Sequence, residues 1–486
     1  MVKIKLTKKE IALSSLLFIV CHIILLAVLF AAITINTEGE FIEFFRREYI
    51  NITTVAVAVS ILSMIIYFYF FIENKALLVS YKKIIEIYFL LCLSFLVCDV
   101  IGKYVAPTAR PLLFFPLLAC MFFRRREAIF LNTINLLITF VFNRYVNSVD
   151  ISGGSVQMIE SFAGLLTSFC CGVAAIFIMK NIKTRLGCVL CVIALVVPVI
   201  AVNLVMQVPS VNGDWFTIIE IIIYSVFDCI MSVLLFMCVL PIVEGLFSEL
   251  TVFRLRELTS DNAKLIKHMK QHALGTYNHS VVVAQLAEAC ASAIGEDSEL
   301  ARACSYYHDV GKLKNPEMFA ENQTEYDMHK ELTPELSVDI IRSHAKDGAQ
   351  LIRKNRLPEI FADIAVQHHG TMPIKYFYAK ALRMSDGELN ANNYSYSGPT
   401  PTTKIAAIIM IADASEAAAR SLTDRSPEKV AALVGSLVEE RMNQEQFFDC
   451  DITMRELTIV TQTIINQLTG VYHSRVKYPK LVLQRK

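Results

Sequence analysis

The chain has 486 residues, of which 55% are hydrophobic and 19% are charged, and its mean hydropathy is +0.49. Because the apolar residues gather before residue 245, this composition excludes a single soluble domain and predicts a membrane part followed by a soluble part. The net charge of +1 excludes a global electrostatic field that would attract a nucleic-acid polymer.

Eight apolar runs are candidates for membrane spans, since a helix needs about 20 apolar residues to cross a bilayer. The first run, 11–35, follows a basic N-terminus and has no convincing cleavage site, so we expect a span that starts inside the cell. The later runs are 52–72, 84–105, 108–123, 128–143, 158–179, 186–206 and 215–243. The runs 108–123 and 128–143 are short, and prolines interrupt the first of them. This pair forms either two spans or a re-entrant pair.

Basic residues mark the loops that we assign to the cytoplasm, as expected for a membrane protein. They are Lys75, Lys82, Lys83, Arg124–Arg126, Lys180, Lys183, Arg185, Arg254 and Arg256. Eight spans from an inside start return the soluble part to the cytoplasm. We therefore expect a multi-pass protein of a bacterial-type inner or plasma membrane, in contact with the lipid bilayer.

The chain divides into four predicted parts. Residues 1–51 form a first span and a short extracytoplasmic loop, 52–247 a seven-span membrane domain, 248–274 a connecting helix, and 275–486 a catalytic domain. Val252–Lys270 has amphipathic spacing, which suits transmission of motion from the last span, pairing with a second copy in a homodimer, or a plain surface helix. Helical patterns without a strand run then follow, so both halves are predicted to be all-α.

Seven residues of the soluble part have metal-ligand chemistry and are expected to meet in a compact helical domain. They are His279, His308, Asp309, His344, His368, His369 and Asp413. Consecutive helical residues point about 100° apart, so His308 can bind one ion while Asp309 bridges to another. We assign one ion to His279, His308, Asp309 and Asp413, and the second to Asp309, His344, His368 and His369. Imidazole and carboxylate ligands without thiolate favour manganese, iron, zinc or cobalt, with manganese and iron as the leading candidates.

Two ions about 3.5–4 Å apart can clamp a phosphate and activate a water, which predicts hydrolysis of a phosphodiester or phosphomonoester. Asp309 and Lys312 are the predicted catalytic residues. Lys312 lies one turn after His308, where it can contact a phosphate oxygen or the leaving oxygen, or form a surface salt bridge. Gly311 allows a close turn beside the metals or ends the helix.

Four stretches of the soluble part carry a resemblance to a known family. Tyr306–Lys312 is similar to the signature of the HD phosphohydrolase superfamily. The stretches 368–371, 375–381 and 398–413 resemble the seven-transmembrane receptor-like HD-domain family, whose characterised members hydrolyse cyclic di-AMP to the linear dinucleotide. The resemblance implies that the seven ligands form that family's dinuclear site.

Two departures from the family pattern are visible. Members usually carry a large extracytoplasmic domain after the first span, whereas only about 16 residues, Asn36–Asn51, occupy that place here. Asn278 also stands where a histidine commonly precedes the first ligand, which removes no predicted ligand because His279 remains.

A cyclic dinucleotide offers two phosphates and two purine faces, so its site needs cationic or hydroxyl donors and aromatic surfaces. The candidate substrate contacts are Lys312, Thr371, Tyr376, Tyr378, Lys380 and Arg420. Arg420 lies two turns after Asp413 on the same helix face. The two tyrosines equally fit helix packing.

The leading hypothesis is a membrane-anchored phosphodiesterase that hydrolyses cyclic di-AMP to linear pApA. Cyclic di-GMP or a linear dinucleotide is the alternative substrate, although the tripeptide GYP expected of the cyclic di-GMP branch does not follow His368 and His369. A different class is a membrane receptor that uses the HD domain as a nucleotide-responsive module. Seven intact ligands favour catalysis over pure sensing.

Overall fold

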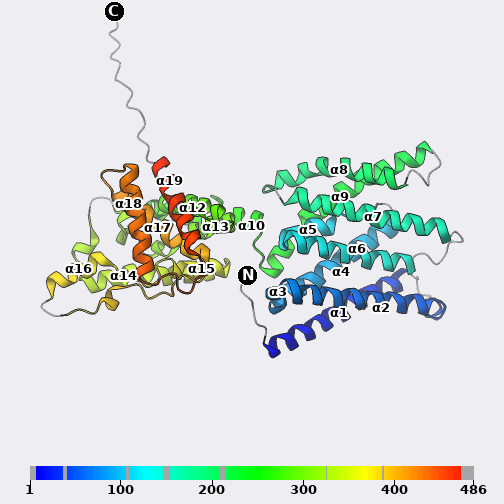
Figure 1. Cartoon of the computed structure of the whole chain (residues 1–486), viewed down its shortest axis with the longest axis horizontal. Coiled ribbons are helices and arrows are strands. Elements are labelled where there is room, and N and C mark those ends of the chain that lie inside the picture. Colours follow the sequence, from blue (N-terminus) through cyan, green and yellow to red (C-terminus); the bar gives the residue numbers. More distant parts are fainter. Residues whose placement is uncertain are drawn as a thin grey trace, which may run out of the picture. The chain divides into compact units, whose positions relative to one another are not determined.

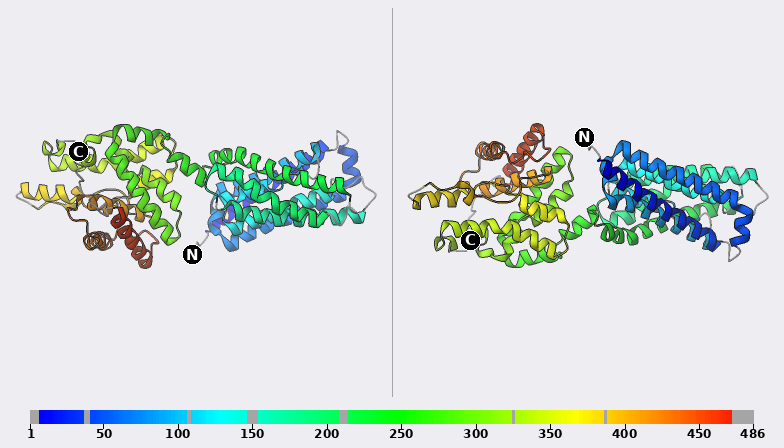
Figure 2. Two further views of the ribbon diagram at one scale, coloured as in Figure 1. Left: turned by 90° about the horizontal axis from the view of Figure 1, so that it is seen from above. Right: turned by 90° about the horizontal axis from the view of Figure 1, so that it is seen from below.

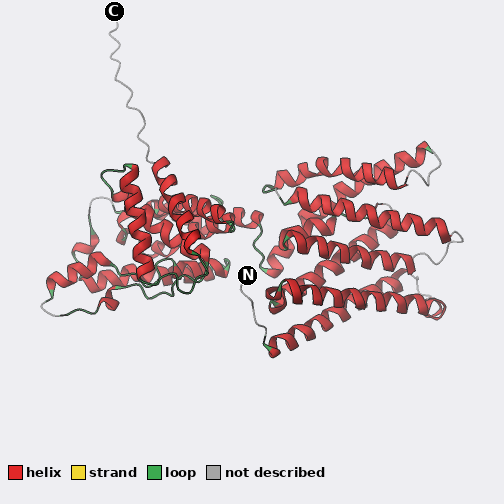
Figure 3. Cartoon of the chain, viewed as in Figure 1, coloured by secondary structure: helices red, strands yellow, loops and turns green. Residues whose placement is uncertain are grey.

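The computed structural model describes residues 7–36, 41–105, 109–145, 154–180, 182–207, 214–323, 326–385 and 388–471. The chain divides into two compact units, Met1–Phe253 and Arg254–Lys486 (Figure 1). The described residues are helices and loops, and the only strand-like pairing among them is an isolated bridge between Pro373 and Ser395 (Figure 3). The prediction of an all-α chain is therefore confirmed.

The helices of the first unit run side by side in a bundle (Figure 2). They are α1 (Lys8–Asn36), α2 (Phe41–Glu73), α3 (Lys75–Val79), α4 (Tyr81–Tyr104), α5 (Phe114–Phe122), α6 (Arg125–Tyr145), α7 (Gly154–Met179), α8 (Arg185–Gln207) and α9 (Trp215–Phe247). Within the described residues, six of them are long and apolar enough to cross a membrane: α1, α2, α4, α6, α8 and α9. In α7, the described apolar part is Leu165–Met179. Large apolar side chains such as Leu13 and Ile193 are exposed on these helices, as lipid contact requires.

The predicted fourth span is not a single helix, because α5 has only 9 residues. Its end lies beside the start of α4, where Lys83 Nζ donates to the Phe122 carbonyl at 3.3 Å. At the other end, Arg110 packs against Gly102 near the end of α4. Since a helix rises about 1.5 Å per residue, the stretch of α4 from Lys83 to Gly102 is about 28 Å long, close to the hydrocarbon thickness of a bilayer. The segment 110–122 therefore extends along α4, from near its end to near its start.

A broken span needs partners for its free backbone groups, because lipid offers none. The N-cap residue of α5, Leu113, has no side-chain cap. Instead, the buried carboxylate of Asp228 on α9 lies near the backbone amides of Leu112 and Leu113. This carboxylate also accepts a hydrogen bond from Ser232 Oγ at 2.9 Å. A long-range side chain thus allows α5 to begin inside the bundle.

The second unit is built from short helices around α12. Its α-helices are α10 (Val252–Leu258), α11 (Lys264–His272), α12 (Leu274–Ile294), α13 (Ser298–Tyr307), α14 (Pro334–Lys354), α15 (Glu359–Gln367), α16 (Lys375–Met384), α17 (Lys404–Ser421), α18 (Pro427–Asn443) and α19 (Met454–Val471). Five short 3-10 helices lie between them: η3 (Val310–Lys314), η4 (Pro316–Met318), η5 (Ala320–Asn322), η6 (Met328–Lys330) and η7 (Ala391–Tyr394). The α-helix α12 packs against α13, α17 and α19, so its residues face several neighbours at once.

The predicted single helix over Val252–Lys270 is divided into α10 and α11. Between them, Ala263 has an extended backbone and serves as the N-cap of α11. The amphipathic pattern holds in α11, where Leu265, Ile266 and Met269 are buried. Two short helices with a break do not form the continuous rod that the sequence pattern suggested.

If 110–122 is a complete crossing, Tyr104 and Arg124 lie on opposite sides of the membrane. We expect Tyr104→Cys and Arg124→Cys to react with a membrane-impermeant maleimide from opposite faces of oriented vesicles. Lys82→Cys, at the start of α4, is the matched control and should react from the same face as Arg124→Cys. Labelling of the 104 and 124 positions from one face would contradict the crossing.

Candidate metal centre

Five α-helices bring all seven predicted ligands together. His279 comes from α12 and Asp413 from α17, whereas His344 comes from α14. The adjacent pairs stand at helix ends: His308 and Asp309 directly follow α13, and His368 and His369 directly follow α15. Two groups of ligand atoms result, each within 4.8 Å of one another: Asp309, His344, His368 and His369, and His279, His308, Asp309 and Asp413.

Asp309 belongs to both groups, and its side chain is 1% exposed. Its Oδ1 faces one group, at 3.3 Å from His344 Nε2 and 3.6 Å from His368 Nε2. Its Oδ2 faces the other, at 3.3 Å from His308 Nε2 and 3.6 Å from His279 Nε2. One carboxylate thus presents one oxygen to each group, as a residue that bridges two ions must.

Backbone carbonyls set the tautomers of three histidines. Nδ1 of His308 donates to the Ser305 carbonyl at 2.6 Å, and Nδ1 of His368 to the Ala365 carbonyl at 2.9 Å. Nδ1 of His344 likewise donates to the carbonyl of Ile341. A neutral imidazole with a proton on Nδ1 presents a lone pair on Nε2, which is the form that binds a metal.

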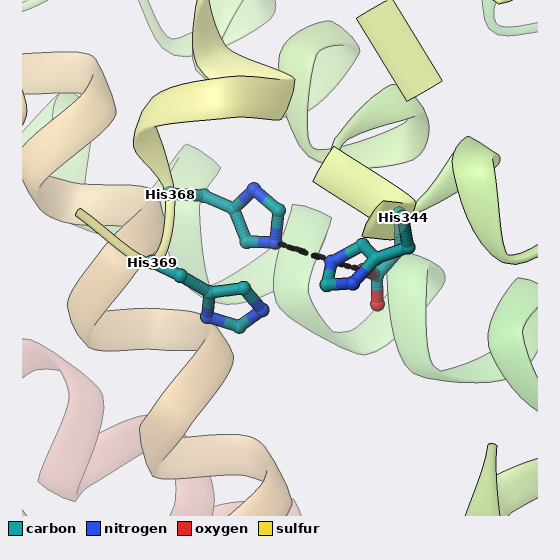
Figure 4. A group of neighbouring side chains, drawn as sticks. His344, His368 and His369 are labelled. Carbon is teal, nitrogen blue, oxygen red and sulfur yellow. Dashed lines mark hydrogen bonds and ion pairs between the residues drawn. The ribbon is translucent and has the colours of Figure 1, made fainter. Parts of the chain in front are cut away.

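Two buried atoms of the centre have no hydrogen-bond partner, namely His308 Nε2 and Asp309 Oδ1. Buried acceptors without a partner are rare and need a reason. Around them, His344 Nε2 lies 3.4 Å from His368 Nε2, so two ring nitrogens face each other without a proton to share (Figure 4). Figure 4 shows the rings of His344, His368 and His369 directed toward one space. This donor set fits divalent transition-metal ions.

Charge and burial keep two of the ligands, Asp309 and His369, in their metal-binding forms. Burial alone would raise the pKa of Asp309, but the charge of Lys312 and the neighbouring imidazole of His308 hold that pKa well below its ordinary value. Burial and the neighbouring charge of His368 lower the pKa of His369 well below its ordinary value. Asp309 is therefore a carboxylate and His369 a neutral imidazole, as metal ligation requires.

Glu416 supports His279 from behind, a role that the sequence reasoning missed. Its carboxylate accepts a hydrogen bond from His279 Nδ1 at 2.5 Å, while His279 Nε2 lies 2.9 Å from Asp413 Oδ1. Burial alone would lower the pKa of His279, but these two carboxylates raise it above its ordinary value. A carboxylate on the outer nitrogen orients a ligating histidine and increases its basicity.

Arg420 is engaged by the same carboxylate. Its Nε donates to Glu416 Oε1 at 3.1 Å, one helical turn away on α17. Arg420, which the sequence suggested as a phosphate contact, therefore binds Glu416 in this structure. Arg420 extends the chain of hydrogen bonds that ends at His279.

Lys312 lies between two acidic residues instead of at the protein surface. Its Nζ is 2.7 Å from Asp309 Oδ2 and 2.7 Å from Glu321 Oε1, and its side chain is 12% exposed. Glu321, on η5, also accepts a hydrogen bond from Thr276 Oγ1 at 3.2 Å. Burial alone would lower the pKa of Lys312, but the charges of Asp309 and Glu321 raise it, so the ammonium remains charged.

Gly311 is required for a close helix contact and does not merely end α13. A Cβ atom built on Gly311 would overlap the carbonyl oxygen of His344 and the backbone nitrogen of Gly348. The backbone of η3 therefore touches that of α14. This contact sets Asp309 and His344 at their short separation.

The remaining substrate candidates have different surroundings. Thr371 is exposed, and Tyr376 is 69% exposed at the start of α16. Tyr378 packs beside Tyr394, with ring centroids 5.5 Å apart, in a small apolar cluster. Lys380 Nζ donates to the His329 carbonyl at 3.2 Å. Tyr378 and Lys380 thus have partners within the domain.

The sequence reasoning also missed Tyr396. Its ring stacks on His369, with centroids 4.1 Å apart and planes at 22°. The backbone N–H of Tyr396 donates to the Met372 carbonyl at 3.0 Å, which fixes this strand-like segment next to the ligands. The alternation of Tyr394 and Tyr396 was the only sequence signal for an ordered segment here.

Replacing Gly311 by alanine should separate η3 from α14 and damage the centre. We expect Gly311→Ala to lose bound metal and to cost about 1–3 kcal/mol of stability, as overpacking does. Metal content by mass spectrometry and thermal unfolding of the purified chain would measure both effects. Gly435→Ala is the matched control: it has no neighbour within 4 Å and lies inside α18, so it should stabilise the helix by about 1 kcal/mol. Full metal content in Gly311→Ala would contradict the close contact.

Removing the charge of Glu416 should weaken one metal site without removing a ligand. We expect Glu416→Gln to reduce metal affinity about 10- to 100-fold, the usual effect of losing a carboxylate behind a histidine ligand. A competition titration with a chelating dye would measure this change. Glu439→Gln, at an exposed position of α18, serves as the control, and equal affinities for the two variants would rule out the proposed support of His279.

Comparisons with known proteins match both halves of the chain. The HD-domain family model matches residues 276–418, and the model described as 7TM receptor with intracellular HD hydrolase matches residues 49–251. The chain is 46% identical over 242 residues to the cyclic-di-AMP phosphodiesterase PgpH of Listeria monocytogenes, covering 50% of this chain and 34% of that protein. It is 42% identical over 250 residues to the PgpH of Bacillus subtilis, covering 51% of this chain and 35% of that protein.

A crystal structure of the HD domain of L. monocytogenes PgpH in complex with cyclic-di-AMP aligns with 44% of this chain and 99% of that chain, at 46% identity and a TM-score of 0.42. The matched region spans about a third of the length of the curated relatives. Six apolar helices and the membrane-domain match make the protein a multi-pass membrane protein. With one model matched in each half, the chain is similar to seven-transmembrane receptors with an intracellular HD hydrolase domain.

Proposed function

We propose that this protein is a metal-dependent phosphodiesterase that hydrolyses cyclic di-AMP to linear pApA. The observation that carries the proposal is the position of Asp309, whose two oxygens face two separate groups of ligands. Identity of 46% over 242 residues and of 42% over 250 residues to two cyclic-di-AMP phosphodiesterases supports this substrate. Two divalent ions, with manganese and iron as first candidates, would be held by the ligand sets named above.

Such ions would supply Lewis-acid activation of a water and neutralisation of phosphate charge. The protein's own groups do the rest. An ammonium has three N–H donors, and Asp309 and Glu321 engage two of those on Lys312. The third can donate to the phosphate and stabilise the 3′-oxygen as the P–O3′ bond breaks and water oxygen bonds to phosphorus.

The proposed location of the HD domain is the cytoplasm, where a cytosolic second messenger would be found. The basic residues between the spans support this orientation. Lys83 at the start of α4 contacts both the Phe122 carbonyl, two residues before Arg124, and Glu249, just after α9, so these basic segments lie at the end of the bundle where α9 ends. The membrane domain would thus hold the enzyme at the inner face of the bilayer.

A substrate panel with the purified full chain tests the proposal. With manganese present, we expect cyclic di-AMP to be converted to pApA faster than cyclic di-GMP is cleaved, and chelation to stop the reaction. Asp309→Asn should reduce kcat at least about 1,000-fold, because an amide has only one oxygen that can bind an ion and carries no negative charge, so the bridge between the two ion sites is lost. Asp339→Asn is the control, since Asp339 is 62% exposed and its ion-pair partner is Arg342, which is not a metal ligand. Unchanged turnover by Asp309→Asn would refute the dinuclear mechanism.

A further inference from the structure

The loop of residues 444–453, between α18 and α19, is attached to the turn that carries two metal ligands. Gln446 in this loop is 1% exposed. Its Oε1 accepts a hydrogen bond from the backbone N–H of Thr371 at 3.0 Å, and its Nε2 donates to Thr371 Oγ1 at 2.8 Å. Thr371 is the second residue after His369, so the 444–453 loop is joined directly to the metal centre.

Two further contacts hold this loop in place. Gly370 has a positive φ of 52°, and a Cβ atom there would overlap Gln446 Oε1, so the loop touches the backbone of the turn. Thr400 Oγ1 donates to Asp449 Oδ2 at 2.7 Å on the other side of the loop. The 444–453 loop is therefore anchored before and after residues 447–448.

Phe448 stands between these anchors and is 84% exposed. Its backbone N–H donates to the Glu445 carbonyl at 3.1 Å, and Glu445 has a positive φ of 55°, so the backbone there forms a tight turn. Single exposed apolar residues are ordinary in proteins. Phe448 differs from such residues in two ways. A tight, anchored loop holds its exposed ring, and it lies two residues after Gln446, whose side chain contacts the turn that carries two metal ligands.

Among the metal ligands, the side chain nearest to this loop is also the most exposed to solvent. The side chain of His369 is 23% exposed, whereas those of His308, His368 and Asp309 are 1% exposed or less. Thr371, next to it, is exposed. The ligands are therefore closest to solvent at His369 and Thr371, where Gln446 of the 444–453 loop makes its contacts.

We propose that Phe448 is a stacking platform for a purine base of the dinucleotide whose phosphate lies at the metal centre. This inference rests on the proposed function and adds to it a base-binding subsite. Aromatic side chains bind nucleobases through their faces, and each such stack contributes substantially to affinity. The other aromatic candidates fit this role less well: Tyr378 is packed against Tyr394, and Tyr376 lies at the start of α16 without an anchor to the ligand turn.

Steady-state kinetics of the full chain provide the first test. We expect Phe448→Ala to raise KM for cyclic di-AMP roughly 5- to 140-fold, the affinity of one base–aromatic stack, while kcat changes by less than threefold. Phe448→Trp should retain a low KM. Methyl p-nitrophenyl phosphate, a diester without a purine, should show a far smaller loss of kcat/KM in Phe448→Ala than cyclic di-AMP does.

Met454→Ala is the matched control, because Met454 is a 62% exposed apolar residue at the start of α19. Its KM should match that of the wild type. Tyr376→Ala is the rival variant. A KM increase in Tyr376→Ala together with an unchanged KM in Phe448→Ala would overturn the inference.

Fluorescence gives a second test that does not depend on turnover. The chain has one tryptophan, Trp215, so Phe448→Trp in a Trp215→Phe background has a single reporter. Mixing with cyclic di-AMP in a stopped-flow instrument should quench this reporter before hydrolysis, whereas Met454→Trp in the same background should not respond.

The two proposals fail in different ways. A wild-type enzyme that hydrolyses cyclic di-AMP, with an unquenched reporter and an unchanged KM in Phe448→Ala, would remove the stacking subsite and leave the proposed function intact. A quenched reporter in a protein that does not hydrolyse cyclic di-AMP would support the subsite and refute the phosphodiesterase. An unquenched reporter without hydrolysis would refute both.

Discussion

The burial of one shared carboxylate is the constraint on which the rest of the HD domain depends. An unpaired buried charge is strongly unfavourable, so Asp309 needs cations on several sides. Lys312 supplies one charge permanently, and the two ligand groups offer places for others. The close contact of Gly311 with α14 brings both groups to the same carboxylate, because it places Asp309 and His344 on backbones that touch. Without that contact, one residue could not face two groups.

The ends of two helices position four of the metal ligands. His308 and His368 each occupy the C-cap of a helix, and each donates Nδ1–H to a carbonyl three residues earlier. The last carbonyls of a helix have no backbone donor within the helix, so a histidine there satisfies one of them and gains a fixed ring orientation. The following residue, Asp309 or His369, then leaves the helix direction and points to the centre. The pairs His-Asp and His-His are therefore local devices that a sequence can reveal.

The adjacent ligand pairs could be predicted from the sequence, whereas the side chains that contact the site from distant segments could not. The order of the seven ligands and their division into two groups could be read from residue chemistry. Glu321 and Gln446 could not, because they reach Lys312 and Thr371 from segments whose packing no periodicity encodes. Glu416 lies one turn after Asp413 and could have been noticed as a same-face carboxylate. In the membrane half, the prolines around the start of α5 indicated an interrupted apolar run, but Asp228, which lies near the start of α5, comes from a helix distant in the sequence.

Substrate contacts are harder to predict than metal ligands for a physical reason. A metal ligand must have a particular donor atom at a buried position, so its type and spacing are restricted. A cation or an aromatic residue near a site has many other uses, and three candidates are engaged inside the domain: Arg420 with Glu416, Lys380 with the His329 carbonyl, and Tyr378 with Tyr394. In the proposed subsite, the bases are then recognised by groups that remain exposed to solvent near His369, the most exposed ligand of the metal centre. An anchored loop suits that task, because it presents its ring without first having to order its backbone.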